Sequence, residues 1–184
     1  MSDGYRPPSR IRLSAGVPAD PDPDPGVTSW GELGRLRPDL TDGGRELLYQ
    51  HGVGLAFLAT VRRDGGPRLH PFCPLLTDDA MYGFIIPSLK QEDLLRDGRY
   101  AVHSFPTQDN EDAFCVTGLA SVVSDAALRQ ALGEQFVGER ADLGVPFPCD
   151  DDLLVTLAID SCLWTRTDGF GDWNPRHEVW RHHR

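Results

Sequence analysis

The sequence predicts a mainly β protein, an antiparallel barrel or sandwich with short helices at its periphery. Three observations support this fold class. Six segments are rich in strand-forming residues, turn chemistry joins the first two segments as in a hairpin, and strands and helices do not alternate as they do in βαβ units. The expected strands cover residues 54–62, 67–76, 81–86, 99–105, 113–123 and 152–165.

The first 28 residues differ in composition from the rest of the chain. Proline and aspartate alternate through most of residues 18–25, and such a pattern forms neither a helix nor a central strand and buries little apolar surface. We therefore expect residues 1–28 to be a flexible tail. Residues 29–184 are expected to form a single domain, because their number supports one hydrophobic core.

Capping residues predict where the helices begin. Ser29 and Glu32 have the spacing of a capping box, in which each side chain accepts a hydrogen bond from the other residue's backbone N–H. The expected N-caps are Ser29, Thr41 or Asp42, Ser88 and Ser124. The helices that follow them are expected over residues 30–37, 42–50, 89–96 and 125–137.

Turn-forming residues separate the first three strands. Asp64–Gly66 contains Asp-Gly and Gly-Gly pairs, which tolerate positive φ and favour a hairpin. Thr77–Asp79 turns the chain again before the third strand. Gly118, inside the fifth expected strand, indicates a β-bulge or a close approach of two backbones.

The short helix after the third strand contains the first candidate site. Ser88 is a good N-cap, and Gln91 completes a capping-box pattern. Lys90 lies in the first turn, where a cation opposes the helix dipole. A bound phosphate would remove this conflict, because helix N-termini bind anions; the alternative is a solvated surface lysine. The buried stripe of this helix is expected to contain Leu89, Leu94 and Leu95.

The second expected strand contains the other half of the candidate site. Arg68, His70 and Phe72 alternate with their neighbours, so their side chains share one face of the strand. That face is either a solvent-facing surface or the wall of a groove beside the helix that begins after Ser88. A ligand made of a planar ring and a phosphate would contact both elements, with the ring along the strand and the phosphate at the helix start.

Charge and hydropathy exclude several classes of partner. The formal net charge of -10 argues against a nucleic-acid partner and against binding to an anionic membrane surface. No apolar run approaches the ~20 residues of a membrane helix, and the start of the sequence lacks the apolar region of a signal peptide. We therefore expect a cytoplasmic protein.

Motif content assigns neither a catalytic side chain nor a metal ligand. The sequence has no G-x-S-x-G nucleophile, no H-E-x-x-H metal site, no G-x-G-x-x-G loop and no Walker loop. None of the four cysteines belongs to a C-x-x-C pair. We therefore expect no catalytic side chain and no metal site, which fits a protein whose chemistry is carried by a cofactor.

Several short segments, taken in order, resemble the pyridoxamine 5′-phosphate oxidase-like, flavin-binding split-barrel superfamily. They are Leu58–Arg62, Asp64–Pro71, Ser88–Lys90, Leu94–Leu95 and Asp97–Val102. The resemblance covers roughly residues 45–165. It implies a six-stranded antiparallel split β-barrel, a homodimer, and one flavin mononucleotide (FMN) in each of two clefts between the subunits.

The resemblance also implies which residues bind the cofactor. Ser88 and Lys90 match the helix start that binds the phosphate, and the strand from His70 to Cys73 matches the segment beside the flavin ring. Phe84 and Ile85 match positions that flank the cofactor, and Trp164 matches a tryptophan from the partner subunit. The full set of expected cofactor-binding residues is His70, Pro71, Phe72, Cys73, Phe84, Ile85, Ser88, Lys90 and Trp164.

Two departures from the family pattern affect the expected function. Leu89 stands where relatives with oxidase activity have an arginine, so one phosphate contact worth about 1.5–3 kcal/mol is missing. Arg176–His177 only partly matches the pair that reads the pyridoxal substrate, so we expect a substrate other than pyridoxamine phosphate.

Three functional hypotheses follow from this comparison. The first is an FMN-dependent oxidoreductase acting on a small-molecule substrate. The second is a reductase that uses a 5-deazaflavin coenzyme. The third is a non-catalytic module that holds a flavin or a haem, with His51, His103 or His177 as an axial ligand, and a barrel without a cofactor is a further alternative.

Overall fold

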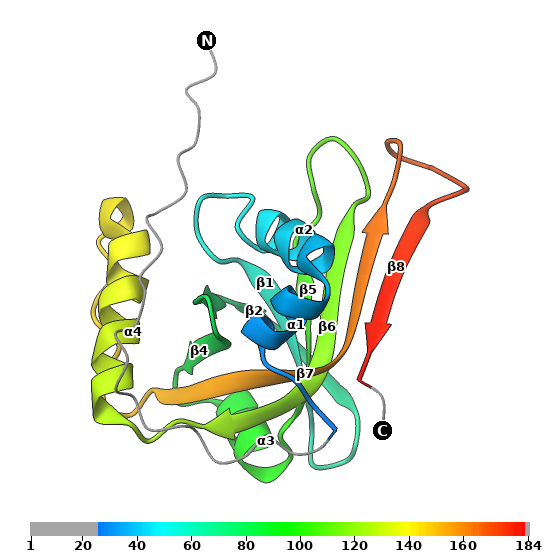
Figure 1. Cartoon of the computed structure of the whole chain (residues 1–184). Helices are drawn as coiled ribbons and strands as arrows, with labels where there is room; N and C mark the ends of the chain where they lie inside the picture. Colours follow the sequence, from blue (N-terminus) through cyan, green and yellow to red (C-terminus); the bar gives the residue numbers. More distant parts are fainter. Residues whose placement is uncertain (1–25, 183–184) are drawn as a thin grey trace.

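Eight antiparallel strands form one curled sheet within residues 26–182, the part of the chain that the computed structural model describes (Figure 1). The strands are β1 (Ala56–Val61), β2 (Pro67–Phe72), β3 (Leu75–Leu76), β4 (Met81–Ile85), β5 (Arg99–Ser104), β6 (Ala113–Val122), β7 (Leu153–Arg166) and β8 (Arg176–Arg181). Their order is β2-β1-β5-β6-β7-β4-β3, and β8 also pairs with β7. The predicted mainly β class and all six predicted strands are confirmed.

Two strands extend the predicted set. The predicted run 67–76 divides into β2 and the two-residue β3, and β8 forms in a segment for which no strand was predicted. β6 pairs along most of one edge of β7. β4 pairs with the beginning of the other edge, and β8 pairs with its end. The result is an antiparallel split barrel with peripheral helices.

Four α-helices accompany the sheet in the described part of the chain: α1 (Trp30–Leu36), α2 (Pro38–Leu48), α3 (Leu89–Arg96) and α4 (Ala126–Glu139). The capping box of Ser29 and Glu32 is confirmed, with hydrogen bonds of 3.2 and 3.0 Å. Two predicted starts are wrong. α2 begins at Pro38, because proline suits the first helical position, and Asp125 rather than Ser124 caps α4. Among residues 26–182, no helix is long and apolar enough to cross a membrane.

The segment before α1 joins the sheet through its last residues. Thr28 exchanges two backbone hydrogen bonds with Ile159, of 2.8 and 2.7 Å, and Val27 and Thr28 are buried. Residues 1–25 lie outside the described part of the chain, so the expected tail is not described over that range.

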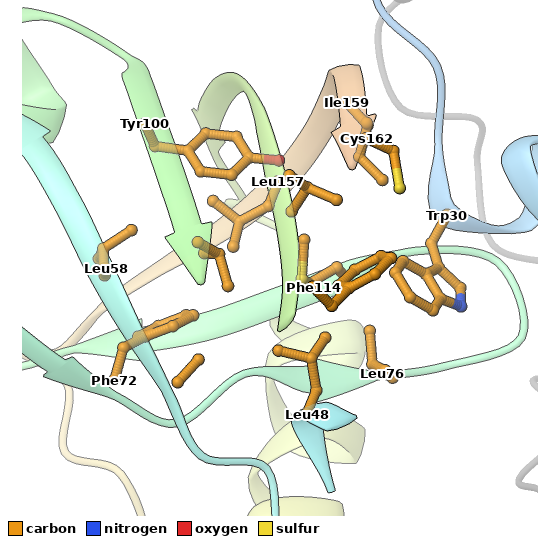
Figure 2. Close-up of a cluster of buried hydrophobic side chains, with 14 of the residues drawn as sticks. Trp30, Leu48, Leu58, Phe72, Leu76, Tyr100, Phe114, Leu157, Ile159 and Cys162 are labelled. Atoms are coloured by element: carbon orange, nitrogen blue, oxygen red, sulfur yellow. The ribbon is translucent and has the colours of Figure 1, made fainter. Parts of the chain in front are cut away.

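The main core lies between the inner face of the sheet and helices α1 and α2. Phe114 on β6 is fully buried. Its ring packs edge to face against that of Trp30, with the two ring centroids 6.0 Å apart (Figure 2). A Cβ atom added at Gly44 of α2 would lie 2.4 Å from the Phe114 ring, so only a glycine lets this helix approach so closely. The sequence therefore places small residues on α2 where large ones rise from the sheet.

A β-bulge bends the long β6–β7 pair, as Gly118 predicted. The pairing register shifts between Thr117 and Gly118, because Asp160 is an extra residue on β7. A Cβ atom at Gly118 would lie 1.9 Å from the backbone oxygen of Ala158. The bulge and the close approach that the sequence predicted are both confirmed.

Side-chain packing closes the gap between the two ends of the sheet. β2 and β4 are not hydrogen-bonded neighbours, yet the ring of Phe72 on β2 lies directly over Gly83 on β4. A Cβ atom at Gly83 would be 2.3 Å from that ring. Phe72 belongs to the same buried cluster as Leu58 on β1 (Figure 2), so this seam is continuous with the main core.

Candidate functional site

Helix α3 begins without a side-chain cap, so the predicted capping box of Ser88 and Gln91 is wrong. The Ser88 hydroxyl donates instead to the Ile86 carbonyl at 2.8 Å. The Gln91 amide donates to the carbonyls of Ile85 at 3.1 Å and Asp151 at 3.0 Å. Gln91 therefore ties the start of α3 to the end of β4 and to the residues before β7. No side chain of residues 26–182 caps the first turn of α3.

Lys90 lies in this uncapped first turn and is the only lysine among the 184 residues. Its side chain is half-buried. Within residues 26–182 it makes no ion pair and no hydrogen bond. A cation without a counter-ion at the positive end of a helix dipole is an unfavourable arrangement, and a bound anion would offset it.

The buried face of α3 differs from the predicted stripe. Leu94 is buried, as predicted, but Leu89 and Leu95 are exposed. The second buried residue is Asp93, which is only 3 % exposed. A short helix that carries a buried carboxylate needs polar partners from neighbouring strands.

Asp93 obtains these partners from three elements. Its Oδ2 accepts from Arg68 Nε of β2 at 2.7 Å and from Thr60 Oγ1 of β1 at 3.0 Å. Its Oδ1 accepts from the two terminal nitrogens of Arg96, each at 3.2 Å. Burial opposes ionisation of the Asp93 carboxyl, but these hydrogen bonds outweigh it and hold its pKa below the ordinary value. The carboxylate therefore fastens α3 to the β1–β2 hairpin.

The face shared by Arg68, His70 and Phe72 is the inner face of the barrel. These three residues pair with Thr60, Leu58 and Ala56 of β1, all of which are buried. The shared face is confirmed, and of the two predicted environments the solvent-facing one is wrong.

His70 contributes a polar atom without a partner. Its Nε2 is buried and forms no hydrogen bond within residues 26–182. His70 follows Arg68 on the same face of β2, and Arg68 is joined to α3 through Asp93. A buried nitrogen without a partner costs free energy, so it suits a place where a ligand supplies the missing acceptor or donor.

The other predicted residues lie in varied environments. Pro71 is exposed on the outer face of β2, and Cys73 is half-buried just beyond it. Ile85 is buried in the main core. Phe84 points to the other face of β4, where its ring packs against that of Phe136 of α4, with the two ring centroids 6.0 Å apart. Successive residues of a strand face opposite sides, so Phe84 and Ile85 do not share a wall of the barrel.

Trp164 lies far along β7 from the start of α3 within one chain. Ile85 pairs with Leu153 at the beginning of β7, whereas Trp164 pairs with Phe114 near its end. The Trp164 ring packs against Gly43 of α2. One chain therefore does not bring Trp164 together with Ser88 and Lys90.

A separate polar hollow of about 280 Å³ lies at the loop after β5. It is lined by Gln50, His51, Thr107, Gln108, Asp109 and Asn110. None of the predicted cofactor-binding residues lines it, so it does not belong to the candidate site.

Three residues that build the site were not predicted from the sequence: Thr60, Asp93 and Arg96. One signal could have identified Asp93, because it follows Lys90 by three residues and therefore shares a helix face with it. Asp93 also lies beside Leu94 on the buried side of this short helix, and a buried acid requires a basic partner. Arg68 was available as that partner, because one of its two predicted environments was the wall of a groove beside the helix.

Comparison with known proteins identifies the fold. No protein-family model and no curated protein matches the sequence. General stress protein 26 from Bacillus anthracis is a similar solved structure, with 20 % identity, a TM-score of 0.55, and coverage of 80 % of this chain and 98 % of that one. A general stress protein 26-related protein of the pyridoxinephosphate oxidase family from Clostridium acetobutylicum has 11 % identity, a TM-score of 0.53, and coverage of 82 % and 95 %.

A haem-binding protein from Mycobacterium smegmatis is also similar in structure. It has 15 % identity and a TM-score of 0.58, and the alignment covers 76 % of this chain. The chain spans only 57 % of the length of that protein. With the antiparallel sheet and its seam at Phe72 and Gly83, these similarities lead to one conclusion. The chain has the split-barrel fold of the pyridoxamine 5′-phosphate oxidase-like proteins.

Proposed function

We propose that this protein binds FMN between the start of α3 and the inner face of β2 and acts as a flavin-dependent oxidoreductase on a small-molecule substrate. The observation that carries the proposal is the uncapped first turn of α3, where the chain's only lysine has no counter-ion among the described residues 26–182. The unpartnered Nε2 of His70 on the adjoining strand is a second indication of a ligand.

The residues present fit the two parts of FMN. The first-turn N–H groups and the ammonium of Lys90 would hold the phosphate. The Ser88 hydroxyl would join them by turning away from the Ile86 carbonyl, to which it donates here. The segment His70–Cys73 would lie beside the ring, with His70 Nε2 available to a polar ring atom. A bound flavin would supply the hydride-transfer chemistry; the chain would orient the ring and exclude water from it.

A homodimer is part of the proposal. Large apolar side chains remain exposed around the site, namely Leu69, Ile86, Leu89 and Leu95. A second copy that covers them would remove apolar surface from water. Trp164 keeps its proposed role only in such a dimer, since within one chain it lies at the far end of β7.

A haem-binding module is the alternative that a specific observation favours. An unpartnered imidazole nitrogen such as His70 Nε2 is a suitable axial ligand for haem iron, and the similar Mycobacterium smegmatis protein binds haem. The absorption spectrum of the purified protein distinguishes the two. Flavin gives a broad blue absorption, whereas haem gives a sharp Soret band near the ultraviolet.

Replacing Lys90 by alanine is expected to weaken FMN binding by about 10- to 150-fold, the equivalent of one charged hydrogen bond of about 1.5–3 kcal/mol. Fluorescence titration of the full-length protein measures the dissociation constant. In a thermal-shift experiment, FMN at 100 times that constant should stabilise the parent protein by about 2.7 kcal/mol.

Lys90→Arg is the matched control, because it keeps the positive charge at the helix start. It is expected to retain most of the FMN affinity. Titration with a 5-deazaflavin coenzyme in parallel decides which flavin the site prefers. Equal FMN affinity in the parent and in Lys90→Ala would show that the phosphate does not bind at this helix, and the proposal would fail.

A further inference from the structure

We infer that Asp93 is a positioning residue for the phosphate site: it fixes the guanidinium of Arg68 and the first turn of α3 in one orientation beside β2. This inference rests on the proposed function. Asp93 is a buried acid and cannot itself bind a phosphate. It would act by holding in place the cations that can bind one.

The hydrogen-bond pattern on Arg68 supports an oriented guanidinium. Asp93 engages only Nε of Arg68, at 2.7 Å. The two terminal nitrogens of Arg68 form no hydrogen bond within residues 26–182, and the side chain is 23 % exposed. Arginine donates from a rigid planar fork, so fixing Nε also fixes the direction of both free amino groups.

The carboxylate of Asp93 is itself fully engaged. Thr60 and Arg68 occupy one oxygen, and Arg96 occupies the other. Arg96 also donates to the backbone carbonyl of Val61. Because these partners come from β1, β2 and α3, the carboxylate leaves little freedom for α3 to turn or slide against the hairpin.

Charge alone and positioning predict opposite effects of removing this acid. Asp93 pairs with two cations, Arg68 and Arg96, and Lys90 lies one turn before it on the same helix. If Asp93 acted only through its charge, replacing it would leave more positive charge and tighten phosphate binding. If it positions Arg68 and Lys90, replacing it weakens phosphate binding despite the added positive charge.

The test measures FMN and riboflavin affinities of Asp93→Asn, because riboflavin has the same ring without the phosphate. We expect FMN affinity to fall about 10-fold, close to the effect of one lost charged hydrogen bond, and riboflavin affinity to stay within about 2-fold. Equal loss for both ligands would indicate general loosening of the barrel, and a gain in FMN affinity would indicate charge alone; either result overturns the inference.

Two further variants make the test specific. Asp97→Asn is the matched control, since Asp97 pairs with Arg99 at the exposed end of the same helix; its FMN affinity should stay near that of the parent. In an Arg68→Gln background, Asp93→Asn should cost much less FMN affinity than it does alone, because its effect passes largely through Arg68. Independent, additive losses would contradict the inference.

A conservative substitution covers the case in which Asp93→Asn does not fold. Thr60→Val removes one hydrogen bond to Asp93 and keeps every charge. A selective FMN loss of about 2- to 10-fold supports positioning, whereas an equal loss for FMN and riboflavin overturns it. If Lys90→Ala weakens FMN binding but neither of these variants does so selectively, only the positioning role fails and the proposed function stands.

Discussion

Replacing Arg140 by methionine is expected to lower the free energy of unfolding by about 3–5 kcal/mol, because the buried Glu139 carboxylate loses its cationic partner and keeps only the neutral donors Tyr49 and Gln135. Arg140, just after α4, is 4 % exposed. It donates to Glu139 at 3.2 Å and to the backbone oxygen of Gly54 at 3.1 Å. Its guanidinium also lies over the Phe136 ring, 4.2 Å from the centroid. Urea unfolding followed by circular dichroism measures the loss.

The loss in Arg140→Met should depend on pH. Burial raises the pKa of Glu139 above its ordinary value, and Arg140 is one of the contacts that oppose this rise. Without Arg140 the folded-state pKa rises further above the unfolded one. The folded state then binds a proton more tightly, so the cost of ionising Glu139 is full above the folded pKa and disappears as pH falls below the unfolded one.

A second substitution separates the charge from the packing. Adding Glu139→Gln to Arg140→Met removes the uncompensated acid, so part of the lost stability should return at neutral pH. The deficit of Arg140→Met should also shrink as the solution is made mildly acidic. A deficit that is independent of pH and unaffected by Glu139→Gln would show that Arg140 acts only through its packing and backbone contacts.

Replacing Phe114 by alanine is expected to cost about 3–5 kcal/mol of unfolding free energy, the usual range for a fully buried phenylalanine. The ring is fully buried between Trp30 and Gly44, so its loss leaves a cavity under α1 and α2. Thermal and urea unfolding measure the change, and near-ultraviolet circular dichroism reports the packing of Trp30.

Gly44→Ala gives a sharp control for this prediction. In the parent protein the new methyl group would lie 2.4 Å from the Phe114 ring, so the substitution should destabilise the fold. In the Phe114→Ala background the same methyl group enters the cavity, and the substitution should be neutral or stabilising. The same destabilisation in both backgrounds would mean that Gly44 does not pack against Phe114.

The sequence predicted well those elements that are determined by residues close together in the chain. Alternation of apolar residues and the Asp64–Gly66 turn are enough to locate the β1–β2 hairpin. β8 was missed because the segment before it is rich in glycine, proline and aspartate. That strand forms because the end of β7 offers it a free edge, and this edge depends on residues far away in the sequence.

In the candidate site, too, the features set by neighbouring residues were predicted and those set by distant residues were not. The three consecutive residues Ser88–Lys90 are enough to predict the start of α3. The capping prediction failed because Gln91 finds its acceptors at Ile85 and at Asp151, 60 residues further along the chain. The cluster around Asp93 joins residues from β1, β2 and α3, and no local pattern in a single sequence reveals such an arrangement.

The single lysine has a practical consequence. Endoproteinases that cleave after lysine have one possible cut in this chain, at the start of α3. Acylating reagents likewise meet one side-chain amine besides the α-amino group. Reagents that label most proteins at many places therefore become selective for the first turn of one helix, and the rate of this single modification, with and without a nucleotide present, reports directly whether that turn is covered.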